Sequence, residues 1–578
     1  MSSTRERIPA HLRQFVVDQD YEAYDEIDQA VWRFVLLQTY SRLKETAHPA
    51  YVDGLAQTGI SVERIPRIEE MDAGLSEFGW GAVVVDGFIP PRAFQEFQAH
   101  GIMTIAAAIR RRRNLAYTPA PDIIHESAGH APIVPDPTYR EFLRRFGEIG
   151  AKAFASRQDH EVYLAIRNLS EVKEDRDSTP EMIEAAQKRL NEAQANVTWT
   201  TEAARLGRLH WWTVEYGLVC SLDDPKIYGA GLLSSLGEST SCLKPHVQKI
   251  PLSVACTEMD YDITRPQPQL YVAEDFEHLN AVLDEFADGL AQRKGGVEAL
   301  EMMHAAAELG TVQFSDGTQV SGVLEEIVDA DGAPAYLRFG GECALALSGS
   351  TLPEQGRDEH REGYGTPFGR LDDGRSLGEM TAEDLEAMQR DGRLRLRYRS
   401  GVEVEGRLTR TQSDESGRLR VFTLEEAHAR LGDRVLFAPD WGRYDVAVGE
   451  HVVSCFAGPA DPDYHPATEF SRATAPRPKD NETAAEEGVV LHLYREALRL
   501  WENPEAPDLV DGFRRIEAEL SEHPDEWLLR WNLLESLQKV DREPELQAKL
   551  REDLLEIEKS DPGGLPISTG LRYLETVQ

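Results

Sequence analysis

Long hydrophobic runs and clustered cysteines are both absent from this chain of 578 residues. No apolar run reaches the roughly 20 residues that a membrane-spanning helix needs. The first residues are polar and acid-containing, unlike the apolar core of a secretory signal. The five cysteines are widely spaced and form no CxxC pair, which argues against a disulfide framework or a cysteine-rich zinc site. We therefore expect a protein of the cytoplasm with no membrane partner.

Positive charge is also scarce. The chain has 101 acidic and 62 basic residues, a net charge of −39, and only 12 lysines among its basic residues. Such a charge repels phosphate backbones and anionic lipids, so no nucleic-acid partner is expected. An acidic excess with few lysines is typical of proteins adapted to high salt, because salt screens the repulsion between like charges.

The length exceeds what one hydrophobic core serves, so we expect several domains. Residues 1–310 show apolar residues mainly at helical spacing, and residues 311–460 show a period of two. Residues 461–486 have the composition of a linker. Residues 487–578 carry amphipathic helices, expected to form a helical bundle, with tetratricopeptide-like pairs as the alternative. The predicted fold is a mainly α domain with small β elements, then a β-rich module, then a C-terminal helical bundle.

The β-rich region contains an internal repeat. Apolar residues alternate around the turn Asp316-Gly317 and again around Ser400-Gly401, and Gly322 in the first copy matches Gly406 in the second. Short glycine turns between alternating apolar residues favour β-hairpins. We predict a duplicated small β module without catalytic residues of its own. Residues 311–578 are where we expect any contact with a second copy or with a partner protein.

The segment richest in chemistry runs from Pro121 to His130. Its two histidines, His125 and His130, are five residues apart, which places them about 140° apart on a regular α-helix. We expect them to converge because the helix ends between them, at Gly129. The spacing differs from the metalloprotease motif HExxH, whose histidines are four residues apart on one helical face.

A third candidate ligand lies downstream. Glu215 belongs to the aromatic and apolar run Trp211-Trp-Thr-Val-Glu-Tyr-Gly, where a carboxylate is costly to bury unless it is paired or bound to a metal. Two histidines and one carboxylate leave one side of a metal open, as in non-haem Fe(II) oxygenases. From these residues alone, a zinc hydrolase with Glu126 as general base remains an alternative.

Several segments resemble, in the same order, the pterin-dependent aromatic amino acid hydroxylases. The likeness spans about residues 20–310. It is carried by the segments Gly87–Phe94, Pro121–His130, Trp211–Gly217, Tyr228–Glu238 and Leu270–Phe276. The resemblance implies a monooxygenase in which His125, His130 and Glu215 bind Fe(II). It also implies a tetrahydropterin beside the metal and O₂ as co-substrate.

The resemblance further implies which residues bind the organic ligands. For the pterin they are Gly87, Ile89, Phe94 and Glu126. For the free aromatic amino acid they are Arg110, Thr118, Pro121, Trp211, Ser234 and Val272. A guanidinium such as that of Arg110 can hold an α-carboxylate through two hydrogen bonds. Asp122 is expected to orient a metal ligand or Arg110 through hydrogen bonds, and His210 is expected to contact a metal ligand without binding the metal itself.

The identity of the amino acid follows from two positions. An apolar Val272 favours phenylalanine over tyrosine, and Trp211 in place of phenylalanine argues against tryptophan. The resemblance therefore implies conversion of phenylalanine to tyrosine, with tyrosine or tryptophan as alternative substrates. The sequence departs from the family pattern at His210, where tyrosine is usual, and in a charged stretch at about 168–198, which we interpret as a surface helical hairpin.

Overall fold

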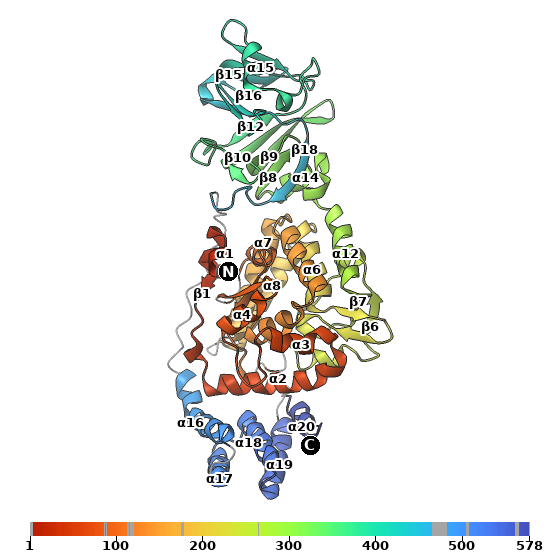
Figure 1. Ribbon diagram of the computed structural model, residues 1–578, viewed down its shortest axis with the longest axis vertical. Helices are drawn as coiled ribbons and strands as arrows, with labels where there is room; N and C mark the ends of the chain where they lie inside the picture. The colour runs from red at the N-terminus through yellow and green to blue at the C-terminus, as the bar shows by residue number, and fades with distance from the viewer. Residues whose placement is uncertain are drawn as a thin grey trace.

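The structure is a computed structural model. It describes residues 4–85, 87, 89–112, 115, 121–174, 178–263, 265–464, 483–503, 508–560 and 566–576. Along the chain, a helical region with small sheets is followed by two antiparallel β sheets and then by a run of helices (Figure 1). This order confirms the fold class that the sequence predicts.

The helical region is built on α2 (Glu26–Thr46), which Asp25 and Asp28 begin with a reciprocal capping box. Most of the residues of this helix from Ala30 to Thr39 are fully buried. Thirteen further helices of this region are described: α1 (Thr4–Arg7), α3 (Pro49–Gln57), α4 (Ile68–Ser76), α5 (Pro91–Ala99), α6 (Pro137–Gly150), α7 (Arg157–Glu174), α8 (Pro180–Ala195), α9 (Glu202–His210), α10 (Ala230–Leu233), α11 (Glu238–Ser241), α12 (Phe276–Asp288), α13 (Ala291–Lys294) and α14 (Gly296–Ala306). Shorter helical turns include η4 (His125–His130) and η6 (Trp211–Glu215).

Two small sheets position the segments between these helices. The first has the order β1 (Val16–Val17), β2 (Gly81–Val85), β3 (Ile102–Ala106), and the second the order β5 (Pro225–Ile227), β4 (Leu218–Cys220), β7 (Gln269–Ala273), β6 (Gln248–Pro251). Strands β2 and β3 are parallel, so the segments that carry Gly87 and Arg110 leave the sheet at one edge. Strand β4 follows Glu215 closely and pairs with β7, with Leu218 opposite Val272.

The charged stretch that the sequence predicts as a surface hairpin is formed by α7 and α8. The two helices pack against each other around a small core of their own: Ala165, Leu169, Ala186 and Leu190. At the base of the hairpin, the side chain of Gln158 donates to the carbonyl of Asn196 at 2.8 Å. This bond joins the start of α7 to the end of α8 and closes the hairpin at its base.

The β-rich region contains two sheets with matching strand orders. The first comprises β8 (Leu309–Phe314), β9 (Thr318–Ala330), β10 (Ala333–Leu347), β11 (Ser350–Thr351), β12 (Tyr364–Pro367) and β18 (Val452–Ala457). The second comprises β13 (Leu394–Arg397), β14 (Val402–Ser413), β15 (Leu419–Leu431), β16 (Arg434–Phe437) and β17 (Tyr444–Ala447), and the short helix α15 (Ala382–Ala387) precedes β13. In each sheet the third strand also pairs with a later one, β10 with β12 and β15 with β17.

Glycines recur at equivalent places in the two copies. Gly317 and Gly401 take positive φ angles of 88° and 85° in the predicted turns. A Cβ on Gly322 would lie 2.7 Å from Cys343 Sγ, and one on Gly406 would lie 2.9 Å from a neighbouring side chain. The pairs of glycines thus serve the same turn and the same close strand contact in both copies, as the repeat predicts.

The last region consists of α16 (Thr483–Glu502), α17 (Leu509–Leu520), α18 (Trp527–Lys539), α19 (Pro544–Ser560) and α20 (Ile567–Thr576). These helices lie along α2 on the side away from the β sheets (Figure 1). The Phe34 ring meets the rings of Trp527 and Trp531 edge-on, at centroid distances of 5.0 and 4.8 Å. Arg33 makes two 3.1 Å bonds to the buried carboxylate of Glu535. The C-terminal helices and α2 therefore share one continuous core.

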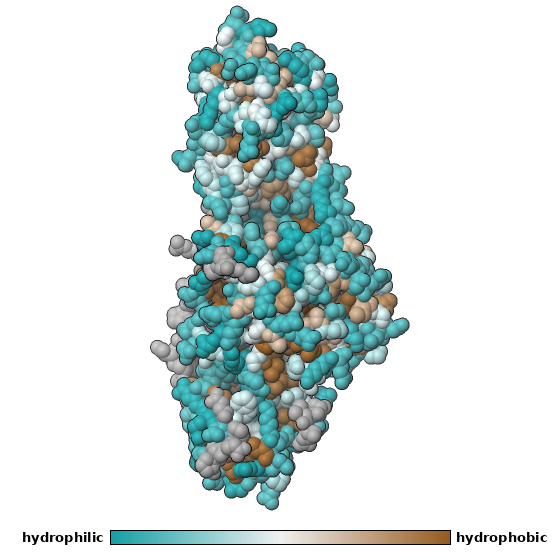
Figure 2. All heavy atoms as spheres, in the orientation of Figure 1, coloured by the Kyte–Doolittle hydropathy of each residue, from teal (hydrophilic) through white to brown (hydrophobic). Residues whose placement is uncertain are grey.

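Hydrophilic side chains cover most of the face seen in Figure 2, as the strongly acidic composition predicts. Among the described helices, none is both long enough and apolar enough to cross a membrane. Thr118 and most of the predicted linker 461–486 lie outside the described residues.

Candidate metal centre

Both segments that carry the candidate ligands are π-helical. The helix does not end at Gly129, as we expected: it continues to His130, and the N–H of Ala131 donates to the carbonyl of Glu126, five residues back. In η6 the N–H of Tyr216 likewise donates to the carbonyl of Trp211. A π-helix takes more residues per turn than an α-helix, so residues five apart come close to one face. The predicted convergence is thus reached by widening the helix, and the predicted helix end is wrong.

The three candidate ligands meet at one point. The Nε2 atoms of His125 and His130 are 3.2 Å apart. Nε2 of His125 lies 3.3 Å from Glu215 Oε2, and Nε2 of His130 lies 3.2 Å from Glu215 Oε1. Among the described residues, these three form the one group of His, Cys, Asp or Glu that is arranged to hold a metal ion.

The two histidine ligands stabilise the ionised form of Glu215. Burial acts to raise its pKa, but the field and hydrogen bonds of His125 and His130 outweigh burial and hold the pKa well below its ordinary value. The carboxylate therefore stays ionised, as a metal ligand must be.

A serine selects the tautomer of one histidine. Ser234 Oγ donates to the carbonyl of Ala230 at 2.8 Å and lies 3.0 Å from Nδ1 of His125. Because the hydroxyl proton is used on Ala230, the hydroxyl oxygen accepts the Nδ1–H of His125. The lone pair of His125 is then left on Nε2, which faces the other two ligands. The sequence indicated Ser234 only as a neighbour of the substrate.

Asp122 is a buried carboxylate that contacts both Arg110, which is expected to bind the carboxylate of the substrate, and the metal ligand His125. Asp122 accepts from Nε and NH2 of Arg110 at 2.8 and 2.9 Å, and from the backbone N–H of His125 at 3.0 Å. Burial acts to raise the pKa of Asp122, but Arg110 outweighs it and lowers the pKa. A third guanidinium bond, from NH1, reaches the carbonyl of Ser234 at 3.3 Å. These contacts use three of the five N–H donors that a guanidinium offers.

Aromatic rings form a wall beside Glu215. The Trp211 ring is stacked between Tyr216 and Tyr261, with centroid distances of 4.4 and 4.3 Å. Its Nε1 is buried with no hydrogen-bond partner in the described part of the chain. The sequence pointed to Trp211 but not to the two tyrosines. Tyr216 lies in the same aromatic run, whereas nothing in the local pattern marks Tyr261.

His210, the position where the family pattern has tyrosine, lies behind the ligands. Its Nδ1 is 3.8 Å from Glu215 Oε1, and its ring meets those of Phe94 and Phe146 edge-on. Burial lowers the pKa of His210 to about 4, although Glu215 acts in the opposite direction. The imidazole is therefore neutral at physiological pH. Phe94, a predicted pterin contact, is thereby placed next to the metal centre.

Glu126, the residue after the first ligand, is also buried. Its Oε2 lies 4.0 Å from Nε2 of His130. Burial raises the pKa of Glu126 to about 8, His130 lowers it, and Glu215 and Asp122 raise it further. Burial of this carboxyl thus favours its protonated form.

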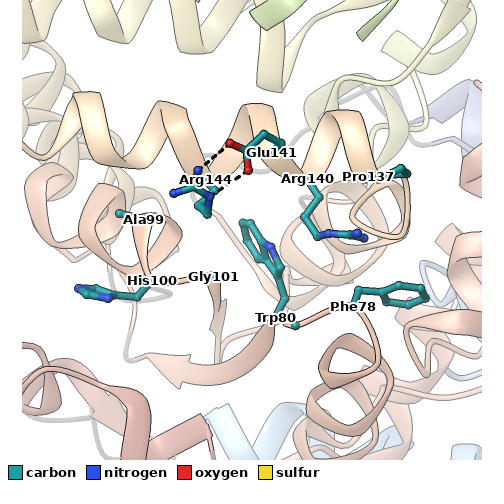
Figure 3. Close-up of a pocket in the computed structure, with 10 residues that line it drawn as sticks. Phe78, Trp80, Ala99, His100, Gly101, Pro137, Arg140, Glu141 and Arg144 are labelled. Carbon is teal, nitrogen blue, oxygen red and sulfur yellow. Dashed lines mark hydrogen bonds and ion pairs between the residues drawn. The ribbon is translucent and has the colours of Figure 1, made fainter. Parts of the chain in front are cut away.

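The remaining predicted residues surround this centre less closely. Gly87 is exposed and has a φ of 66°, and Ile89 is buried; both follow β2. Val272 is buried on β7, beside the strand that follows Glu215. Pro121 is exposed, immediately before Asp122. Figure 3 shows a separate pocket of about 500 Å³ whose lining includes none of the predicted residues and in which Arg144 pairs with Glu141.

Two imidazoles and one carboxylate, carried on two π-helical turns in a mainly helical fold, define a two-histidine, one-carboxylate metalloprotein. Residues 18–167 and 197–298 match the family model of the biopterin-dependent aromatic amino acid hydroxylases. The region that these residues form, a little under half of the chain, belongs to that family. The unmatched stretch between the two segments falls within the hairpin α7–α8.

Named relatives cover about half of the chain. Phenylalanine-4-hydroxylase of Pseudomonas aeruginosa is 27% identical over 297 residues, which are 51% of this chain and 91% of that protein. Phenylalanine-4-hydroxylase of Dictyostelium discoideum is 30% identical over 278 residues, 46% of this chain and 51% of that protein. A crystal structure of the Chromobacterium violaceum phenylalanine hydroxylase has a TM-score of 0.38 at 25% identity, and the match covers 47% of this chain and 84% of that one.

Proposed function

We propose that this protein is an Fe(II)- and tetrahydropterin-dependent monooxygenase that hydroxylates free phenylalanine to tyrosine. The observation that carries the proposal is the convergence of His125, His130 and Glu215 in a chain of this family. Family membership supports an aromatic amino acid as the substrate. Phenylalanine in particular is supported by the buried, apolar Val272 and by the names of the relatives. Tyrosine and tryptophan are the alternatives.

The three ligands fit an iron ion. Their ligand atoms lie 3.2–3.3 Å from one another, close enough for a single ion to be held by all three. Imidazole and carboxylate donors suit Fe(II), and three such ligands on one side leave the opposite side free for other molecules. The ionised Glu215 offsets part of the charge of the ion.

The iron and the reduced pterin supply the oxidising chemistry with O₂, while the protein binds, orients and excludes water. We propose that Gly87, Ile89, Phe94 and Glu126 contact the pterin. Glu126 is suited to this role because its buried carboxyl can donate a hydrogen bond when protonated and accept one when ionised. Phe94 is suited to this role because its ring packs edge-on against His210, whose Nδ1 is 3.8 Å from Glu215 Oε1.

Arg110 is proposed to hold the carboxylate of the amino acid. Its guanidinium is buried and is kept in place by Asp122, yet two N–H donors remain for a ligand. Trp211, Pro121, Val272 and Thr118 would complete the substrate site, with Trp211 contributing an aromatic wall. Ser234 contributes chiefly by orienting His125.

The direct test is loading with Fe(II) under anaerobic conditions. O₂ and tetrahydropterin are then supplied with phenylalanine, tyrosine or tryptophan in separate reactions. We expect hydroxylated product from phenylalanine, and His125→Ala and Glu215→Ala should each abolish product formation and bound iron. His246→Ala, a change at an exposed histidine, is the matched control and should retain both. Stoichiometric zinc with peptidase activity, and no oxygen uptake coupled to the pterin, would contradict the proposal.

A further inference from the structure

Glu526, in the C-terminal helices, is a buried carboxylate that reaches the helical region. It is 4% exposed and directly precedes α18. Its Oε1 accepts the hydroxyl of Tyr494 at 2.8 Å and the N–H of Leu529 at 3.4 Å. Its Oε2 forms an ion pair with Arg112, whose side chain is 34% exposed. A charge buried to this extent is costly unless a partner of opposite sign is held against it.

Arg112 is two residues from Arg110, which is proposed to bind the carboxylate of the amino acid. The backbone N–H of Arg110 donates to Asp122 Oδ2 at 2.9 Å, so this short stretch of chain is held on one side by Asp122 and on the other by Glu526. Asp122 also accepts the N–H of the metal ligand His125. The two charged pairs, Glu526 with Arg112 and Arg110 with Asp122, are therefore joined by the backbone of residues 110–112, and Asp122 continues this connection to the metal centre.

The ion pair of Glu526 with Arg112 is not needed merely to attach the C-terminal helices to the helical region. The same helix α18 is already attached to α2 through the buried pair of Arg33 and Glu535, and through Phe34 against Trp527 and Trp531. These contacts lie on α2 and not next to Arg110. The ion pair of Glu526 differs from these contacts because its partner, Arg112, lies two residues from Arg110.

We propose that Glu526 is a positioning residue for substrate binding: it holds Arg112 and thereby sets the place of the Arg110 guanidinium. This inference rests on the proposed function, in which Arg110 binds the carboxylate of the amino acid. It also assigns the C-terminal helices a role in the reaction of the helical region. Because the contact acts on binding of the amino acid, its loss should affect KM more than kcat.

The test uses the full-length chain with the change Glu526→Gln. Glutamine keeps an oxygen for Tyr494 and Leu529 but removes the charge that holds Arg112. We expect KM for the aromatic amino acid to rise about five- to ten-fold while kcat changes less than about two-fold. Arg112→Gln should have the same effect, and the double change should add little, because both remove one interaction.

Glu535→Gln is the matched control, since it breaks the other buried ion pair of the same helix. It should lower the melting temperature and leave KM unchanged. If Glu526→Gln leaves KM unchanged, or if both variants raise KM equally, the proposed positioning role is overturned.

A second measurement does not depend on activity. Hydrogen exchange followed by mass spectrometry should show faster exchange of the Arg110 amide in Glu526→Gln than in Glu535→Gln. Equal exchange in the two variants would overturn the inference. If the unmodified protein hydroxylates none of the aromatic amino acids, the proposed function fails, whereas the exchange result still decides whether Glu526 positions Arg110.

Discussion

Gly129 shows at the scale of a single residue how tightly the metal centre is packed. It lies in the π-helical turn between the two histidine ligands, and a Cβ there would lie 2.7 Å from the carbonyl oxygen of Ala230 and 3.0 Å from its Cβ. Four residues after Ala230, Ser234 accepts the ring N–H of His125. The segment around α10 therefore supports the first ligand through both backbone packing and a hydrogen bond.

Gly129→Ala should destabilise the protein by about 1–3 kcal/mol, because the added methyl group overpacks a site bounded by backbone. It should also weaken iron binding by displacing His125 or His130. Gly207→Ala is the matched control in helix α9, where a Cβ meets nothing within 4 Å. That change should stabilise the protein by about 0.4–1 kcal/mol. Urea unfolding and iron titration measure both effects, and equal stability of the two variants would contradict the packing argument.

Glu238 makes the stability of the protein depend on pH. Burial raises its pKa to about 7, while the hydroxyl of Tyr216 acts in the opposite direction. Its Oε1 has no hydrogen-bond partner in the described chain. Because the folded state holds the proton more tightly than the unfolded state, this residue lowers stability as the pH rises from about 4.5 to 7.

Glu238→Gln should therefore stabilise the protein relative to the unmodified chain, and more so at higher pH. We expect the advantage to grow by about 1–2 kcal/mol between pH 5.5 and pH 8. Urea unfolding of both proteins at these two pH values measures the difference. An advantage that is the same at both values would show that the ionisation of Glu238 is not its cause.

At the scale of elements, we expect that the hairpin α7–α8 is not needed for the metal centre or for the reaction. The family match stops within α7 and resumes after α8, and the four-residue core of the hairpin does not extend into the main core. Its base is anchored by Gln158, whose side chain also accepts the N–H of Thr198 at 3.0 Å. The turns η4 and η6, which carry the metal ligands, pack mainly against α10 and α9.

Replacing residues 164–190 by a short Gly/Ser turn should keep kcat/KM within about two-fold of the unmodified protein. The change removes the small core of the hairpin together with its outer part and leaves the contacts of Gln158 in place. Steady-state hydroxylation and iron content are the measurements. A more than ten-fold loss of kcat/KM in a folded variant would mean that the hairpin contributes to the site.

At the scale of the whole molecule, the C-terminal helices behave as part of the structure that surrounds α2. A chain ending at residue 464 would expose the face of α2 that carries Phe34 and would leave Arg33 without Glu535. We expect such a chain to melt at least about 5 °C lower and to aggregate. In the full chain, Phe34→Ala should cost about 3–5 kcal/mol for the same reason. An unchanged melting temperature of the shortened chain would show that the shared core contributes little.

The net charge of −39 is also a property of the whole molecule. Repulsion among the acidic residues opposes the compact state, and salt reduces it because the screening length falls to about 3 Å at 1 M. We therefore expect the free energy of unfolding to increase with KCl concentration. Thermal unfolding across a KCl series is the measurement, and full stability in dilute buffer would contradict an adaptation to high salt.

Much of this protein could be predicted from local sequence. The repeated glycine turns predicted the two β copies, and the charged stretch predicted the surface hairpin, because turn chemistry and helical periodicity are properties of neighbouring residues. The ligands His125, His130 and Glu215 were recognised because each lies in a distinctive segment and the segments follow the family's order. The proposed domain boundaries at 310, 460 and 486 remain predictions.

Tertiary structure alone decided how these residues work together. The five-residue spacing of His125 and His130 suggested a helix end, whereas packing of Gly129 against Ala230 accompanies a widened π-helical turn. The bond of Ser234 to His125 and the ion pair of Glu526 with Arg112 join residues more than 100 and 400 positions apart. Such contacts depend on how distant segments pack. The sequence by itself therefore determined which residues form the metal centre, and the packing of distant segments decided how they are oriented and supported.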